Sequence, residues 1–314
     1  MITMIFGAGA SWDSETDVMK NNGMTPPLGD YLFSKLDALN GATSRLDDNT
    51  KKVFIEEGYE AGMERLPPSS RALFPILKES ACFLSSFKPS PENAYTRLFN
   101  RLKNNINKIT IATLNYYMLI EKSLMDLSIN ISYICEDDYD GAKVIKFHGS
   151  SNLVPVLPQG ISISGMTVTS DEGVFLETNS VEFLHSHEEI VRWCNDSRNE
   201  SLCPIMCLYN KEKRVLVSKR AMDEIQGKLS HSIKQSKEII LVGVKYISHD
   251  THLWDLIFKS QCHIVIIDPY PSDELIDILK QNGNEVTIIK KGFYESVNRL
   301  TGIVNHFIRK EKQL

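Results

Sequence analysis

The sequence predicts an α/β fold, with a Rossmann-like parallel sheet and helices on both of its faces. After Ser218, short runs rich in Ile and Val alternate with amphipathic segments of helical length. Fully apolar strands separated by helices are typical of a buried parallel sheet. The chain also opens on an apolar run that leads directly into the small residues Gly7 to Ser11, which indicates a strand, a tight turn and a helix start.

The expected elements can be placed in order along the chain. A strand ends at Phe6, a helix starts near Asp30, and only helices are expected over 44–108, the longest at 69–87. Residues 109–149 return to strand, helix, strand and strand. The acidic stretch Glu136–Gly141 between the last two strands is interpreted as a solvated hairpin turn, with a metal site as the alternative.

The second half of the chain continues this alternation. Residues 150–217 are divided by Pro and Gly into short β-like pieces, followed by a helix near 181–196. After Ser218 we expect four helices: one that ends at Gln235, one over 251–260, one that begins at Ser272, and a last one that ends at Lys312. They alternate with strands at 238–244, 263–268 and 285–290. We therefore predict a single domain over 1–314, with a helical insertion at 44–108 and a small mixed α/β insertion at 150–217.

Composition excludes several classes of function. The 314 residues are 42% hydrophobic and 24% charged, with a net charge of −5, so no general nucleic-acid footprint is expected. The basic run Lys211, Lys213 and Arg214 is a solvated turn or a small local patch. No transmembrane span and no signal peptide are evident, and six scattered cysteines fit a reducing compartment, so we expect a cytoplasmic protein.

Polar or small residues follow three of the expected strands: Gly7 to Ser11, Asn115, and the pair His148-Gly149. In open α/β sheets the ligand lies at the carboxyl ends of the strands, so we expect these segments to share one crevice. The small residues and the N–H groups at the helix start could bind a phosphate. Gly7-Ala8-Gly9 is only half of the dinucleotide-binding fingerprint, and a strand-to-helix turn without a ligand is an equally good interpretation. The alternative for His148 alone is a hydrogen-bonded structural histidine.

At this point the chain resembles the sirtuin-like (SIR2-like) family of NAD-consuming proteins. The resemblance is carried by five short motifs in the family's order: Gly7-Ala8-Gly9-Ala10-Ser11, Thr113-Leu114-Asn115-Tyr116, Lys146-Phe147-His148-Gly149-Ser150, Ile240-Leu241-Val242-Gly243 with His249-Asp250-Thr251-His252-Leu253-Trp254 behind it, and Val265-Ile266-Ile267-Asp268-Pro269. The stretch Pro26-Pro27-Leu28-Gly29 is similar to the bacterial, defence-associated branch.

The resemblance implies an NAD+ hydrolase that cleaves the nicotinamide–ribose bond to give ADP-ribose and nicotinamide. The implied residues are Asn115 and His148 for catalysis, and Gly7, Ala8, Gly9, Ser11, Tyr117, Gly243 and Asp268 for binding NAD. The transition state resembles an oxocarbenium ion and the nicotinamide leaves from a cationic state, so no strong acid is needed. The reaction needs a group that holds the ribose or orients the attacking water, and a base that works near neutral pH. The amide of Asn115 suits the first task and the imidazole of His148 suits the second.

Several of these residues keep a structural alternative. Asp268 binds the adenosine ribose or caps the turn before Pro269, and Gly243 admits the ligand or is a packing glycine. His249, Asp250 and His252 open a helix, and we expect Asp250 to be its cap, with adenine-side packing, rather than a member of a metal cluster. Tyr117 replaces the aspartate that the family has two residues after the asparagine, which puts turnover in doubt more than binding.

No zinc is expected. The family's protein deacylases hold a structural zinc on two cysteine pairs, whereas here only Cys203 and Cys207 form a pair, with Cys194 upstream. His185 and His187 would have to complete the set, and buried thiols are the favoured interpretation. The missing pair argues against a protein deacylase.

The resemblance further implies antiphage defence by NAD depletion, with the activity held back until assembly. Implied partners are a second copy in a homo-oligomer, a partner ATPase or a phage-derived trigger; neither a membrane nor nucleic acid is expected. The alternative is a non-catalytic NAD- or ADP-ribose-binding scaffold that assembles with a partner such as a ring ATPase. Such an ATPase would be a separate chain, because no G-K-[ST] P-loop is present.

Overall fold

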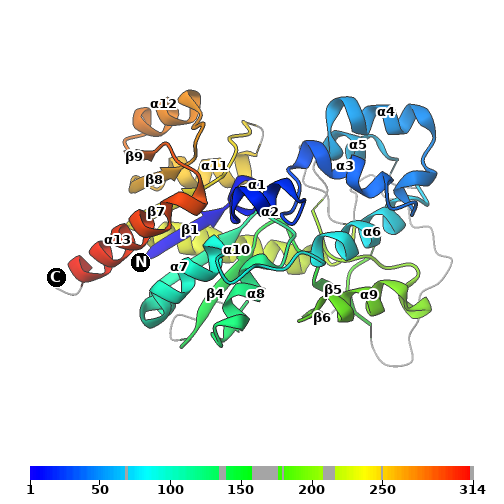
Figure 1. Cartoon of the computed structure of the whole chain (residues 1–314), viewed down its shortest axis with the longest axis horizontal. Coiled ribbons are helices and arrows are strands. Elements are labelled where there is room, and N and C mark those ends of the chain that lie inside the picture. Colours follow the sequence, from blue (N-terminus) through cyan, green and yellow to red (C-terminus); the bar gives the residue numbers. More distant parts are fainter. Residues whose placement is uncertain are drawn as a thin grey trace.

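A seven-stranded parallel sheet forms the centre of the molecule (Figure 1). The computed structural model describes residues 1–67, 70–133, 139–157, 176–178, 180–207, 216–248 and 250–311. The strands of the sheet are β1 (Ile2–Phe6), β2 (Ile109–Thr113), β3 (Ile131–Ser132), β4 (Ala142–Lys146), β7 (Glu238–Val242), β8 (His263–Ile267) and β9 (Glu285–Ile289). Their order is β3-β4-β2-β1-β7-β8-β9, and every neighbouring pair is parallel.

Both faces of this sheet are covered by helices, as the sequence predicts. On one face, apolar residues of β1 such as Met4 pack with α7 (Ala94–Leu102), α8 (Leu119–Asp126) and α13 (Phe293–Glu311). On the other face, Ile5 packs with α10 (Lys219–Gln235), α11 (Thr251–Phe258) and α12 (Asp273–Gln281). A strand that is buried on both faces favours apolar residues, and β1 is apolar except for Thr3, whose buried hydroxyl lies 2.7 Å from Ser236 Oγ.

A second layer of elements lies beside the sheet, at the right of Figure 1. Helices α1 (Ala8–Trp12) and α2 (Asp17–Asn21) lead from the sheet to α3 (Gly29–Asp37), η1 (Thr43–Arg45), α4 (Asp48–Glu57), α5 (Tyr59–Arg65) and α6 (Leu73–Ser85). The chain returns to the sheet through α7 and η2 (Lys103–Lys108). The elements described between 43 and 108 are therefore all helical, while the proposed insertion boundaries stay a prediction.

The described residues of the 150–217 segment contact α6. Strands β5 (Leu153–Val156) and β6 (Ser180–Phe183) form an antiparallel pair, followed by α9 (His187–Asn195) and η3 (Ser197–Asn199). The Lys78 ammonium of α6 donates to the carbonyl of Asn199 at 2.6 Å, and Ser85 Oγ lies 2.8 Å from His187 Nδ1. Two segments that are far apart in sequence are thus joined along α6 and α9.

Two of the expected elements are wrong. The strands that flank the acidic stretch run parallel, Ile131 opposite Ala142, so no hairpin joins them; Glu136 to Asp138 themselves lie outside the described residues. The helix expected near 181–196 begins only at His187, because residues 180–183 form a strand and Ser186 caps the helix by accepting a hydrogen bond from the Glu189 N–H. Apolar spacing alone did not separate that strand from the helix that follows it.

None of the described helices combines the length and the apolar character needed to cross a lipid bilayer. The basic run at 211–214 and His249 lie outside the described residues.

The loops after β1 and β7 pack backbone against backbone. The Gly7 N–H donates to the carbonyl of Val242 and the Gly9 N–H donates to the carbonyl of Gly243, both at 3.0 Å. Gly243 has a φ of +56°, and a Cβ there would clash with the backbone of Gly9 and Ala10. A Cβ on Gly7 would clash with the carbonyl of Gly243. These glycines are therefore required by the fold itself, independently of any ligand.

We predict that Gly243→Ala destabilises the protein by at least about 1–2 kcal/mol, because the new methyl group is strained at positive φ and meets backbone. Gly227→Ala is the matched control: Gly227 lies within α10 with open space around it, and alanine there should raise stability by about 0.5–1 kcal/mol. Urea unfolding of the two variants measures both changes. Equal stability of the Gly243 variant and the parent would contradict the packing argument.

Candidate functional site

The strand order places a candidate ligand crevice at the centre of the sheet. Read from β4 to β9, the order β4-β2-β1-β7-β8-β9 is that of a doubly wound dinucleotide-binding sheet, with β3 added outside β4. The chain reverses its winding direction between β1 and β7, and in such sheets ligands bind beyond the carboxyl ends of the strands at that point. The loops that follow β1, β2, β4, β7 and β8 all lie at this edge, and they carry the residues predicted from the sequence.

Asn115, just beyond β2, is tied to the loop after β1. Its side-chain amide donates to the carbonyl of Gly7 at 2.8 Å and to Ser11 Oγ at 3.1 Å. Its own N–H donates to Thr113 Oγ1 at 3.1 Å. The Asn115 side chain is 8% exposed, and both amide protons are used within the protein. A bound hydroxyl or water would therefore meet this side chain as an acceptor, through Oδ1.

Ser11 lies at the same junction. Its hydroxyl is 3.0 Å from the hydroxyl of Tyr95 on α7, in addition to its contact with Asn115. Burial raises the pKa of Tyr95, which stays protonated and can donate to Ser11. The loop after β1 is thus joined to β2 and to α7, so its conformation does not depend on a ligand.

His148 follows β4 in a loop that a second segment holds in place. Its carbonyl accepts from the Cys207 N–H at 2.9 Å, and the Ser150 N–H donates to the carbonyl of Ile205 at 2.9 Å. Gly149 between them has a φ of +79° and packs directly on Ile205. The stretch Cys203–Cys207, singled out in the sequence for its two thiols, therefore acts through its backbone, as a support for the His148 loop.

The His148 imidazole is 2% exposed and its Nε2 lies 3.3 Å from Nε2 of His252, at the start of α11. The ring of Phe147 stacks on the ring of His252 with a centroid distance of 5.1 Å and an interplanar angle of 7°. The sequence predicts a helix start with adenine-side packing for His252 and gives no sign of this pairing. Only the placement of α11 against the end of β4 brings the two imidazoles together.

A buried ion pair lies beneath the site. Lys146 Nζ, at the end of β4, is 2.9 Å from Glu121 Oε1 on α8, and the two side chains are 0% and 1% exposed. Lys146 Nζ also donates to the carbonyl of Tyr117 at 2.6 Å. One ammonium group thus connects the end of β4, two residues before His148, with the loop that carries Asn115.

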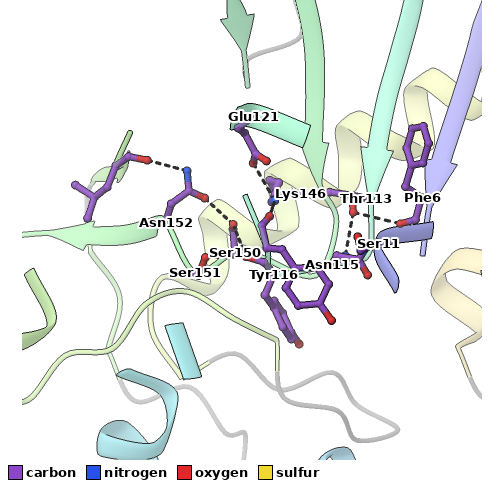
Figure 2. A network of polar contacts seen from close by, with 12 residues as sticks. Phe6, Ser11, Thr113, Asn115, Tyr116, Glu121, Lys146, Ser150, Ser151 and Asn152 are labelled. Atoms are coloured by element: carbon purple, nitrogen blue, oxygen red, sulfur yellow. Dashed lines mark hydrogen bonds and ion pairs between the residues drawn. The ribbon is translucent and has the colours of Figure 1, made fainter. Parts of the chain in front are cut away.

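Further hydrogen bonds join the same two loops, as Figure 2 shows. The carbonyl of Tyr116 accepts from the N–H of Ser151 at 3.1 Å and from its hydroxyl at 2.7 Å. Ser150 Oγ donates to Asn152 Oδ1 at 2.6 Å, and the Asn152 amide donates to the carbonyl of Leu184. The network continues from the loop after β2 to the segment before α9.

Tyr117 follows Asn115 by two residues, in the loop after β2. It is buried, and its hydroxyl donates to the carbonyl of Pro27 at 3.0 Å, while burial raises its pKa. This hydrogen bond from the neutral phenol therefore links the Pro26-Pro27 segment to the loop after β2. This bond gives Tyr117 a structural task, and its role in NAD binding stays a prediction.

Two acidic residues lie beyond β7 and β8. Burial raises the pKa of the Asp268 carboxyl, whereas the hydrogen bond it accepts from the Tyr270 N–H at 2.7 Å lowers it. This hydrogen bond caps the turn at Pro269, which is the structural role expected as the alternative for Asp268. Asp250 occupies the N-cap position of α11, as expected, although its side chain makes no cap hydrogen bond.

The residues considered for zinc make other contacts. Cys194 on α9 interacts with Cys82 on α6, and His187 contacts Ser85. Within the ranges that the structure describes, no group of three or more His, Cys, Asp or Glu side chains could hold a metal ion.

Comparisons with known proteins gave structural neighbours alone. No family model matches the chain, and no curated protein sequence matches it. The chain is similar to a mutant Sir2 homologue bound to ADP-ribose (12% identity, TM-score 0.48, covering 98% of this chain and 93% of that one). It is also similar to a Sir2 homologue–NAD complex (13%, TM-score 0.45, 97% and 89%) and to a Sir2–p53 peptide–NAD+ complex (12%, TM-score 0.46, 97% and 93%).

We predict that Lys146→Met lowers the free energy of unfolding by about 3–5 kcal/mol, because the Glu121 carboxylate is left buried without its counter-ion. Adding Glu121→Leu should restore part of the loss; the carbonyl of Tyr117 still lacks its donor, which costs about 1–3 kcal/mol. The control is Lys219→Met, which breaks an exposed pair with Asp223 and should change stability by less than about 1 kcal/mol. Chemical denaturation of the four proteins would refute the argument if the Lys146 and Lys219 variants were alike.

Proposed function

We propose that this protein is an NAD+ hydrolase that cleaves the nicotinamide–ribose bond and releases ADP-ribose and nicotinamide. The observation that carries the proposal is the placement of Asn115 and His148 at the ends of the adjacent strands β2 and β4, beside the glycine loop of β1. A single polar network holds these strand ends together. The five SIR2-like motifs, in order, specify NAD as the nucleotide that this arrangement would bind.

The proposed chemistry assigns one task to each of the two residues. Asn115, whose amide protons are already engaged, accepts a hydrogen bond through Oδ1 from the ribose or from the attacking water. His148 removes the proton from that water as it attacks the anomeric carbon. The bond to nicotinamide breaks through an oxocarbenium-like state, and nicotinamide leaves as a neutral molecule. Imidazole has the proton affinity that this step needs near neutral pH.

NAD binding is proposed to involve the loops after β1, β7 and β8. The N–H groups of Gly7 and Gly9 already donate to the β7 loop, so the pyrophosphate would be held by the remainder of the first loop, including Ala8 and Ser11. Gly243 shapes the same loop pair, and Tyr117 closes the side next to β2. Asp268, at the end of β8, would accept hydrogen bonds from the adenosine ribose.

We predict that His148→Ala reduces NAD turnover about 10²- to 10⁴-fold while NAD still binds, because a general base is removed. Asn115→Ala should also lose turnover, since the ribose or water acceptor is removed. Release of free nicotinamide from NAD by purified protein is the measurement, and circular dichroism checks that each variant is folded. Turnover by the His148 variant at the parental rate would rule out its assignment.

A second candidate function is a non-catalytic NAD- or ADP-ribose-binding scaffold that assembles with a partner such as a ring ATPase. The observation that favours it is Tyr117: the family's carboxylate is absent, and the phenol is committed to Pro27. Titration calorimetry with NAD and ADP-ribose, run beside the nicotinamide assay, separates the two functions. Binding without nicotinamide release, even after assembly, supports the scaffold.

We further propose that the protein acts in the cytoplasm in prokaryotic antiphage defence, depleting NAD when a partner or a phage-derived trigger releases its activity. An unregulated NAD hydrolase would kill its own host, so control is expected to come from self-association or another chain. The exposed apolar residues Ile55 on α4 and Tyr31 on α3 lie on the helical side and offer part of a contact surface.

We predict that the isolated chain is slow at low concentration and gains NAD turnover as it self-associates or meets its partner. Light scattering over a concentration series, with nicotinamide release measured on the same samples, tests this expectation. A monomer with full activity at every concentration would contradict regulation by assembly, and would leave the hydrolase assignment intact.

A further inference from the structure

Helices α6 and α9 pack against each other beside the main sheet (Figure 1). At one end of their contact Ser85 Oγ lies 2.8 Å from His187 Nδ1, and at the other end the Lys78 ammonium donates to the carbonyl of Asn199 at 2.6 Å. The later residue of α6 thus meets the start of α9, so the two helices run in opposite directions. These two contacts fix the register of the side chains that lie between them.

One cysteine from each helix lies between these two contacts. Cys82 follows Lys78 by four residues and precedes Ser85 by three, so the three side chains share one face of α6. Cys194 follows His187 by seven residues and lies on the same face of α9. The two thiols are hydrogen-bonded to each other. Cys82 is half-buried, whereas Cys194 is buried.

The two thiols differ in how readily they ionise. The hydrogen bond from Cys194 lowers the pKa of the Cys82 thiol and the Lys78 ammonium lowers it further, while burial and the Glu79 carboxylate oppose this shift. The same hydrogen bond, together with burial, raises the pKa of Cys194. The negative charge therefore forms on Cys82, which is also the more exposed thiol. A solvent-accessible thiolate beside a second thiol is the arrangement found in cysteines that react with oxidants.

The other cysteines that the structure describes are placed differently. Cys203 also interacts with the Lys78 ammonium, but it is 1% exposed and burial raises its pKa to about 12. Cys262 is buried with its Sγ 3.1 Å from Ser260 Oγ, and burial raises its pKa. Cys207 is buried as well. Among the described cysteines, Cys82 is therefore the thiol that an oxidant in solution reaches first.

We propose that Cys82 and Cys194 are a peroxide-reactive pair whose oxidation reversibly joins α6 to α9 by a disulfide bond. The Cys82 thiolate attacks one oxygen of hydrogen peroxide; the O–O bond breaks, and Cys82 becomes a sulfenic acid while the released hydroxide takes up a proton to give water. The Cys194 sulfur then attacks the Cys82 sulfur, the S–O bond breaks, and the leaving hydroxide takes the Cys194 proton as a second water. Two thiols are oxidised and one peroxide is reduced. This site does not depend on the proposed hydrolase function.

The disulfide would reinforce elements that support the candidate site. The end of α6 is attached to α8, where the Lys122 ammonium donates to the carbonyls of Ser85 and Phe87 at 2.6 and 2.8 Å. The carbonyl of Leu184, between β6 and α9, accepts from the Asn152 amide in the segment that follows the β4 loop. A bond between α6 and α9 would restrict their relative movement, and a small thiol would release it by thiol–disulfide exchange.

The link is tested by treating the reduced protein with a small molar excess of hydrogen peroxide, blocking the remaining thiols with N-ethylmaleimide and digesting without a reductant. Mass spectrometry should find the peptides of Cys82 and Cys194 joined, and dithiothreitol should separate them. Cys82→Ser and Cys194→Ser should each lose this species. The matched control Cys262→Ser, which removes a buried thiol beside Ser260, should keep it at the parental yield.

The two variants also separate the roles of the two thiols. In Cys194→Ser, Cys82 should stop at the sulfenic acid, which dimedone traps, whereas Cys82→Ser should give no dimedone adduct on Cys194. A link from Cys82 to another cysteine, a link between two chains, or no link at all would overturn the proposal. Dimedone labelling of Cys194 in place of Cys82 would overturn the assigned order of attack.

A further measurement uses the unaltered protein and so does not depend on the folding of a variant. A limiting amount of iodoacetamide near neutral pH should alkylate Cys82 about 10-fold faster than Cys203 or Cys262, because the accessible thiolate is the nucleophile. Peptide mass spectrometry over time gives the three rates. Labelling of Cys203 or Cys262 as fast as Cys82 would overturn the assignment of Cys82 as the reactive thiol.

Discussion

The ion pair between Glu121 and Lys146 is the interaction on which the rest of the candidate site depends. Two opposite charges that are almost fully removed from water are stable only together, so α8 and β4 cannot shift independently. The same ammonium binds the carbonyl of Tyr117 and so fixes the loop after β2 relative to the loop after β4. Asn115 and His148 take their positions from these two loops. The pair thereby contributes to the geometry of the candidate site.

A second constraint is the contact between the loops after β1 and β7, where the winding of the sheet reverses. Glycine is needed at 7 and 243 because the two backbones touch, and the N–H groups of Gly7 and Gly9 are spent on that contact. A glycine-rich loop is commonly interpreted as a phosphate-binding loop, but here the glycines are already required by the close contact between the two backbones. The loops are thereby held ready at the one edge of the sheet where a nucleotide is expected to bind. The helical side and the α9 segment lie beyond this edge and join each other through Lys78 and Ser85.

The candidate site shows which residues sequence patterns can identify. Asn115 and His148 stand out because each follows a run of β-branched and apolar residues and is itself able to donate and accept hydrogen bonds. Lys146 and Glu121 carry no such signal, since a lysine in a strand and a glutamate in a helix are ordinary in sequence, and their burial appears only once α8 covers the sheet. His252 was assigned to helix packing because its partner lies 104 residues away. The hairpin expected before β4 was wrong for a related reason: strand direction is set by what each strand pairs with across the sheet.

The sequence by itself determined the class of fold, the alternation of strands and helices after residue 218, and the loops that meet at one edge of the sheet. It did so because burial on both faces favours strands rich in apolar residues, and this preference is local and visible in the sequence. The tertiary structure decided which polar groups touch: Lys146 with Glu121 and Tyr117, Tyr117 with Pro27, and His148 with His252. These contacts join residues far apart in the chain, and their distances depend on how helices settle on the sheet, which no local pattern encodes.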